Sequence, residues 1–214
     1  LEKFLEAVAY FDRANRPDTR VKSIEALFKA KKYSELKQKL HVLCNTDSAN
    51  IRLAAASAFI CNQLGLPDPY PFCPNPLDFF YSTNVAIHDS NSEKFLTDIR
   101  NEVEAYPAVW EPVDKTSIGG WQTSDIVFNS GQASKKLETI LLKIIHEYRL
   151  IHRDENIEFI RNWPTNFSIK GWFVKLLKGG FQESHIHPDG WLSGVVYLKT
   201  VKSAYQKDGA LELS

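Results

Sequence analysis

The chain lacks methionine altogether, although it has 214 residues. A chain of this length ordinarily carries several methionines, including the initiator, so chance is a poor explanation. Two explanations stay open. Either the chain is an internal piece of a longer protein, or modified methionines were omitted from the written sequence and some spacings are short by a residue or two. Helical periodicity that already begins at Leu1 favours an internal piece.

Other absences narrow the class of protein. The three cysteines, Cys44, Cys61 and Cys73, form no CxxC pair and no even set, which favours reduced thiols in the cytoplasm. The 26 basic residues are balanced by 26 acidic ones, which excludes a nucleic-acid specialist but not a small anionic ligand held by one local cation. No apolar run approaches the roughly 20 residues of a membrane-spanning helix, and the start shows no signal-peptide pattern. We therefore expect a cytoplasmic protein without membrane or nucleic-acid partners.

The composition that remains is ordinary for a globular protein, with 43% apolar and 24% charged residues. Its length allows one large domain or two small ones. Apolar residues at helical spacing fill the first third of the chain. The predicted helices span residues 4–11, 24–43 and 51–64, with a break at Lys31-Lys32 and a stop at Gly65.

Part of this helical region resembles a known repeat. The segment from Ile24 to Asn50 is similar to a tetratricopeptide repeat (TPR), a helical hairpin that stacks on its neighbours. An ordinary helical hairpin with its own core is the alternative. Either reading makes residues 1–66 a structural or partner-binding module, with a peptide, a protein or a second copy of the chain as its partner.

A proline-rich stretch over residues 67–76 supports neither a helix nor a central strand, so we place the domain boundary there. The second domain, residues 77–214, has a mixed pattern. Its expected elements are helices over 93–104 and 133–149, a glycine turn with a short strand over 117–123, and strands over 169–177, 192–198 and 210–213. Helices followed by sequential strands predict the α+β class, with an antiparallel sheet or barrel.

Two histidines are the candidate metal ligands. Of the six histidines, His185 and His187 are one residue apart, so both imidazoles point to the same face of an extended segment. Asp189 continues this alternation. Two histidines and one carboxylate with open positions are the ligands of non-haem Fe(II) oxygenases. The alternative is that these are surface residues beside a turn.

The surrounding residues resemble a family. The stretch H-x-H-P-x-x-x-L-S-G-V-x-Y-L, from His185 to Leu198, and the upstream G-G-W-Q-T are similar to the 2-oxoglutarate/Fe(II)-dependent oxygenases that sometimes follow TPRs. The resemblance implies a double-stranded β-helix (jelly-roll) domain with Fe(II) and 2-oxoglutarate as cofactors. It also implies a dioxygenase that hydroxylates its substrate, which the repeat module suggests is a peptide or protein. Members of this superfamily bind iron through an H-x-D/E pair and a distal His, and hold oxoglutarate with a distal Arg or Lys.

The resemblance also assigns roles to residues. His185 is the preferred metal ligand, and the second ligand is His187 or Asp189. Ser193 and Tyr197 share one face of the following segment with Val195 and would line the oxoglutarate pocket, and Lys199 or Lys202 would bind its carboxylate. The alternatives are ordinary filling of the barrel for Ser193 and Tyr197, and solvated charges at the strand end for the two lysines. Separately, Trp121 and Gln122 lie in the glycine turn, where we expect them to border the substrate opening; an aromatic plug in the core is the alternative.

One departure from the family pattern is plain. No histidine and no arginine follows His187, and the last arginine is Arg161. We therefore expect the last strands of the jelly roll, with the distal ligands, to be missing from the chain. The alternatives are a repeat and jelly-roll binding protein without redox chemistry, or a cupin-like metal enzyme that uses zinc or manganese without oxoglutarate.

Overall fold

The computed structural model describes residues 2–187, 189–200 and 209–212. The chain divides into two compact units, each with its own hydrophobic core. Unit 1 comprises residues 1–79, 152–164 and 186–193, and unit 2 comprises residues 80–151, 165–185 and 194–214. The described residues contain seven α-helices and a three-stranded antiparallel sheet, which is a mixed α+β composition.

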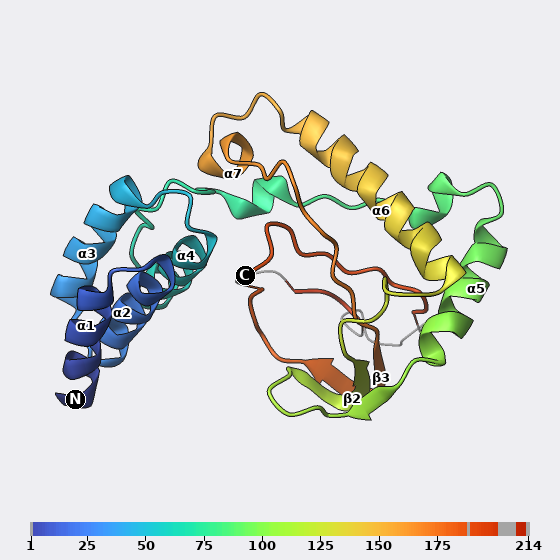
Figure 1. Ribbon diagram of the computed structural model, residues 1–214, viewed down its shortest axis with the longest axis horizontal. Coiled ribbons are helices and arrows are strands. Elements are labelled where there is room, and N and C mark those ends of the chain that lie inside the picture. The colour runs from blue at the N-terminus through green and yellow to red at the C-terminus, as the bar shows by residue number, and fades with distance from the viewer. Residues whose placement is uncertain (1, 188, 201–208, 213–214) are drawn as a thin grey trace. The chain divides into compact units, whose positions relative to one another are not determined.

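Unit 1 is helical (Figure 1). Its elements are α1 (Glu2–Ala14), α2 (Pro17–Lys29), α3 (Tyr33–Thr46), α4 (Ile51–Leu64), the 3-10 helix η1 (Pro76–Phe79) and the short α7 (Glu158–Arg161). Helix α2 is central, since it contacts α1, α3 and α4. The core consists of apolar side chains from α2, α3 and α4, of which Ile24, Leu36 and Leu53 are fully buried.

Local sequence sets the ends of α4. The side chain of Asn50 accepts a hydrogen bond from the Leu53 amide at 3.1 Å, which satisfies one of the free donors at the helix start. Gly65 follows the last turn with a φ of 63°, a left-handed conformation that glycine adopts without steric cost. The helix therefore stops where the sequence predicts.

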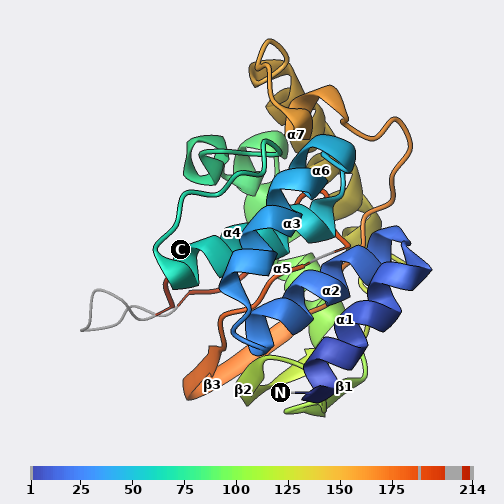
Figure 2. The ribbon, with the colours of Figure 1, turned by 90° about the vertical axis from the view of Figure 1, so that its left-hand side faces the viewer.

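Unit 2 combines two helices with the sheet. Its elements are η2 (Val85–His88), α5 (Ser92–Glu104), β1 (Ala108–Trp110), β2 (Ser117–Thr123), α6 (Gln132–Ile151) and β3 (Val174–Gln182). The strands lie in the order β1-β2-β3, with both pairs antiparallel (Figure 2). Helices α5 and α6 contact each other, and their apolar faces form a core around Phe95, Ile99 and Leu137.

The pairing of β2 with β3 contains a large bulge. Ile118 lies opposite Phe181 and Gly120 lies opposite Leu176, so residues 177–180 of β3 face the single residue Gly119. The two backbones nearly touch here, because a Cβ on Gly180 would lie only 2.5 Å from the Gly119 carbonyl oxygen. Glycine is required for this contact, and the contact allows β3 to keep pairing beyond the bulge.

A carboxylate joins α5 to the start of α6. Glu102 accepts hydrogen bonds from the amides of Ala133 and Ser134, both at 2.9 Å, and from the Tyr106 hydroxyl at 3.2 Å. Burial acts to raise the pKa of Glu102, but these hydrogen bonds, with that of the Ser134 side chain, leave it below its ordinary value of 4.5. The carboxylate caps the first turn of α6 from a neighbouring helix.

The helices predicted from periodicity are confirmed, as α1 to α6, although α2 starts at Pro17 rather than near Ile24. The strands are confirmed only in part. β3 runs from Val174 to Gln182 and includes the glycines expected to end it, because β2 supplies partners on both sides of the bulge.

The other expected strands are not formed in the described chain. Residues 192–198 form no strand, because they have no partner strand there, although Val196 and Leu198 pack against the core of unit 2. Residues 210–212 form none either, and Leu213 lies outside the described residues. Neither a jelly roll nor a TPR is shown, and the division at residues 67–76 stays a prediction. Among the described helices, none is both long and apolar enough to cross a membrane.

We expect Gly180→Ala to lower the free energy of unfolding by about 1–3 kcal/mol, since the added methyl group would collide with backbone rather than with a movable side chain. Gly194→Ala is the matched control, because nothing lies within 4 Å of a Cβ there. Its effect should stay under about 0.5 kcal/mol. Urea unfolding measures both, and equal losses would contradict the close approach of β2 and β3.

We expect Glu102→Gln to cost about 1–2 kcal/mol of stability at pH 7, because a neutral amide is a weaker acceptor for the helix amides. A carboxyl with a depressed folded-state pKa stabilises above its unfolded pKa and loses that effect as pH falls through the folded pKa. The gap between variant and wild type should therefore shrink below pH 4.5. Urea titrations at several pH values test this, with Glu147→Gln on the exposed face of α6 as the control. A gap independent of pH would argue against the carboxylate cap.

Candidate functional site

The histidine pair follows directly from β3. The Glu183 amide donates to the Thr116 carbonyl oxygen at 3.0 Å, which extends the pairing with β2 by one step past the end of the strand. His185 is exposed, and its Nδ1 lies 2.7 Å from the carbonyl oxygen of Glu183. This contact orients the ring and leaves Nε2 as the nitrogen directed away from the backbone. The sheet therefore fixes the chain two residues before the first candidate ligand.

His187 and Asp189 lie at a turn within unit 1. His187 is half-buried, and its carbonyl oxygen accepts a hydrogen bond from the Gly190 amide at 3.0 Å. The carboxylate of Asp189 forms an ion pair with Arg52 in the first turn of α4. Sequence reasoning missed Arg52, because no local signal links two residues 137 positions apart.

The residue that follows the turn is anchored by aromatic rings. Trp191 contacts Phe72 edge to face, with ring centroids 5.3 Å apart, and stacks on Phe159 at 6.1 Å with an interplanar angle of 18°. Phe159 also contacts Phe79 and Trp163, so the rings form a continuous cluster in unit 1. Aromatic pairs of this kind contribute about 0.5–1.5 kcal/mol each beyond the burial of apolar area.

These residues do not complete an iron site. The described ranges contain no group of three or more His, Cys, Asp or Glu side chains that could hold a metal ion. His185 belongs to unit 2, whereas His187 and Asp189 belong to unit 1. A three-ligand site of the kind that the sequence predicts thus does not fit the described residues alone, and His185, His187 and Asp189 stay predicted ligands.

The candidate oxoglutarate residues lie in an irregular segment. Ser193, Tyr197 and Lys199 are exposed. Lys202, the other candidate for the carboxylate, lies outside the described residues. Because this part of the described chain forms no strand, the structure assigns these side chains no common pocket, and their role stays a prediction.

Trp121 and Gln122, predicted at the substrate opening, are neighbours on β2 with opposite environments. Trp121 is 42% exposed and contacts Trp110 edge to face at 5.5 Å. Gln122 is only 6% exposed, and its Oε1 accepts a hydrogen bond from the buried hydroxyl of Ser117 at 2.8 Å. Gln182 on β3 donates in turn to the Ser117 hydroxyl at 3.2 Å. Gln122 therefore has a structural partner in the sheet, whereas Trp121 has an accessible ring.

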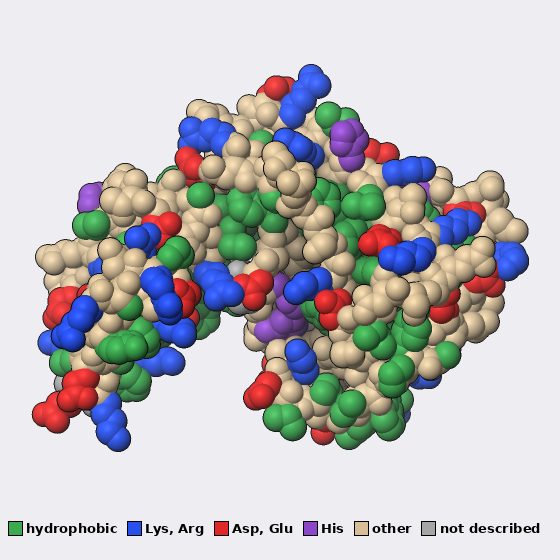
Figure 3. All heavy atoms as spheres, viewed as in Figure 1, with side chains coloured by type: hydrophobic (Ala, Val, Ile, Leu, Met, Phe, Trp, Pro, Cys, Tyr) green, Lys and Arg blue, Asp and Glu red, His purple; other side chains and the backbone are tan. Residues whose placement is uncertain are grey.

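The sheet of unit 2 exposes large apolar side chains. Figure 3 shows hydrophobic side chains gathered over the sheet. Seven large apolar residues of the three strands are each more than a third exposed: Val109, Trp110, Ile118, Trp121, Leu176, Leu177 and Phe181.

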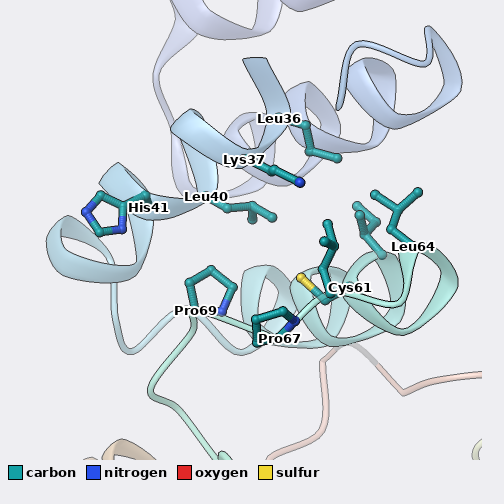
Figure 4. Close-up of a pocket in the computed structure, with 10 residues that line it drawn as sticks. Leu36, Lys37, Leu40, His41, Cys61, Leu64, Pro67 and Pro69 are labelled. Atoms are coloured by element: carbon teal, nitrogen blue, oxygen red, sulfur yellow. The ribbon is translucent and has the colours of Figure 1, made fainter. Parts of the chain in front are cut away.

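Unit 1 holds a separate cavity of about 250 Å³ between α3 and α4. Leu36, Leu40 and Lys37 line it from α3, and Cys61 and Leu64 line it from α4 (Figure 4). Burial is the main cause that raises the pKa of the Cys61 thiol, with the Asp68 carboxylate acting in the same direction. The thiol is therefore protonated at neutral pH and is no activated nucleophile.

We expect Gln122→Ala to lower the free energy of unfolding by about 1–3 kcal/mol, because the buried hydroxyl of Ser117 loses its acceptor. Gln63→Ala on the exposed surface of α4 is the control and should change stability by less than about 0.5 kcal/mol. Urea unfolding measures both variants. If Gln122→Ala unfolded like the wild type, the hydrogen bond would not stabilise the sheet, and a role at the substrate opening would gain support.

Comparison with protein families gives one match. Residues 170–213 match the family model described as "Putative 2OG-Fe(II) oxygenase", in which 2OG is 2-oxoglutarate. Comparison with curated proteins and comparison with solved structures give no match. The matched stretch contains β3, the histidine pair and the turn at Asp189. The family match indicates oxidoreductase chemistry over this short region and assigns no substrate.

Proposed function

We propose that the chain is part of an Fe(II)- and 2-oxoglutarate-dependent dioxygenase that hydroxylates its substrate. The observation that carries the proposal is the family match over residues 170–213, which coincides with the H-x-H motif found from the sequence. The exposed position of His185 after β3 supports it, since a ligand to a catalytic metal must remain accessible to cosubstrate.

In this proposal His185 is one metal ligand, and the second is His187 or Asp189. Residues 77–214 belong to a jelly-roll domain, and the remaining ligands lie outside the described residues. Bound iron with 2-oxoglutarate supplies the oxidising chemistry. The chain itself positions the ligand segment through β3, and Ser193, Tyr197 and Lys199 bind the cosubstrate.

The helical part of unit 1 supports the proposal that the substrate is a peptide or protein. Helices α1 to α4 have 13 or 14 residues each and follow one another through short connections, as in a helical repeat. We propose that this TPR-like module, residues 1–66, binds a peptide or protein partner or a second copy of the chain. A peptide or protein is then the substrate class, and the cytoplasm is the expected compartment.

A second candidate is a metal-free binding protein with the same architecture. The observation that favours it is the incomplete ligand set, because the described residues bring no three metal-binding side chains together. A cupin-like metal enzyme without oxoglutarate would share this incomplete set but would bind zinc or manganese. Metal binding separates the binding protein from both enzymes, and oxoglutarate turnover separates the enzymes from each other.

We expect the protein that contains this chain to bind Co(II), a redox-stable probe for the iron site, and to form succinate from 2-oxoglutarate when supplied with Fe(II). His185→Ala should weaken Co(II) binding by about tenfold or more, because a ligand is lost. Isothermal titration calorimetry measures the affinity, and chromatography measures succinate. His146→Ala, an exposed histidine on α6, is the control and should behave like the wild type.

Equal Co(II) binding and equal succinate formation in wild type and His185→Ala would reject the site assignment. Co(II) binding that depends on His185 without any succinate would favour the cupin-like enzyme. Absence of metal binding in the wild type would favour the binding protein.

A further inference from the structure

The cavity of unit 1 has three walls, all made of described residues. Helices α3 and α4 form two of them, through side chains such as Leu40 and Leu64 (Figure 4). Residues 66–69 form the third wall. Lys37 and His41 are the only strongly polar side chains among the ten that line the cavity. The cavity is therefore mostly apolar, and both of its polar groups come from α3.

The third wall is held in place by hydrogen bonds. The Asp68 carboxylate accepts one from the Ser57 hydroxyl of α4 at 2.6 Å and one from the Tyr70 amide at 3.0 Å. Pro67 and Pro69, on either side of Asp68, each have a restricted φ. The segment thus has few conformations in which it could fold inward and fill the cavity, so the cavity exists before any ligand binds.

One positive charge at this cavity has no partner in the described chain. Burial, followed by the Asp68 carboxylate, raises the pKa of the Cys61 thiol on α4, and the charge of Lys37 acts against this rise, which places the ammonium group near the thiol. No carboxylate of the described residues lies within ion-pair distance of Lys37. An ammonium group beside apolar walls is complementary to an anion that carries an apolar tail.

The volume of the cavity limits the length of that tail. The cavity measures about 250 Å³, whereas an apolar cavity of about 150 Å³ is already able to stay dry and bind benzene. At roughly 30 Å³ for a group the size of a water molecule, the cavity has room for an alkyl tail of about six to eight carbons.

The apolar walls favour a small molecule over a peptide. Each residue of a peptide carries a backbone donor and acceptor that need partners when they are buried. Leucine and proline side chains supply none, and Lys37 and His41 lie on one side only. An alkyl tail has no such requirement.

We propose that this cavity binds a small carboxylic acid, with its alkyl tail between α3 and α4 and its carboxylate next to Lys37. All the residues that line the cavity belong to unit 1, so the proposal is independent of the proposed oxygenase chemistry.

Titration with sodium hexanoate, followed by ¹H–¹⁵N NMR of the 214-residue chain, tests the proposal. Hexanoate should bind saturably with a dissociation constant of about 1–10 mM, the range for a ligand of so few atoms. The shifted amides should lie in residues 36–41 and 60–69. Acetate, which lacks the tail, should not saturate. Non-saturable hexanoate shifts, or shifts centred elsewhere, would overturn the proposal.

A charge reversal separates the contribution of the carboxylate from that of the tail. Lys37→Glu should weaken hexanoate binding about three- to tenfold, since an exposed attraction becomes a repulsion, and should leave 1-hexanol binding within about twofold. Lys22→Glu, an exposed lysine on α2, is the matched control and should bind hexanoate like the wild type. Equal losses in the two variants would show a general effect of net charge and would overturn the role of Lys37.

Two further arms test the place and the class of the ligand. Leu64→Trp should abolish the binding of both hexanoate and 1-hexanol, because the larger ring fills the cavity. Circular dichroism checks that this variant folds, and if it does not, the comparison of Lys37→Glu with Lys22→Glu still decides. N-acetyl-leucine N-methylamide, which places a similar apolar group on a peptide backbone, should bind more weakly than hexanoate. Tighter binding of this peptide mimic would overturn the choice of a small acid.

Discussion

The close approach of β2 and β3 is the constraint on which the candidate site depends. The backbones meet at Gly119 and Gly180 without room for a side chain, and this contact lets pairing resume at Ile118 and Phe181. Pairing then continues to Glu183, whose amide donates a hydrogen bond to Thr116. The carbonyl oxygen of Glu183 contacts the His185 ring. A side chain at the glycine contact would therefore disturb the segment from which the first candidate ligand projects.

The residues beyond His185 depend on a different set of forces. Trp191 makes ring contacts in unit 1 that are worth more than the exposed ion pair of Arg52 and Asp189, which contributes at most about 1 kcal/mol. The two ring contacts therefore stabilise this segment of unit 1 more than the ion pair does. Both contacts lie beyond the histidine pair, and supporting residues of this kind commonly orient metal ligands.

The sequence predicts the helices well and the sheet poorly, for physical reasons. Helical hydrogen bonds join residues four apart, so periodicity and end signals such as Asn50 and Gly65 are sufficient to locate α4. A strand needs a distant partner, which explains why residues 192–198 have the apolar, β-branched composition of a strand without forming one in the described chain. The same limit applies to the site: H-x-H is readable in sequence, whereas the pairing of Arg52 with Asp189 is visible only in the fold.

The family match and the structure together restrict what the chain can contribute to catalysis. The match is confined to residues 170–213, and the described residues bring no complete ligand set together. If the predicted pair of ligands holds an iron ion, a further protein ligand is needed, because two side chains leave the ion with too few protein contacts to be held firmly in one geometry. Ring contacts of Trp191 and the exposed ion pair of Arg52 with Asp189 hold this turn in unit 1, and a site with few ligands depends more strongly on how well each one is positioned.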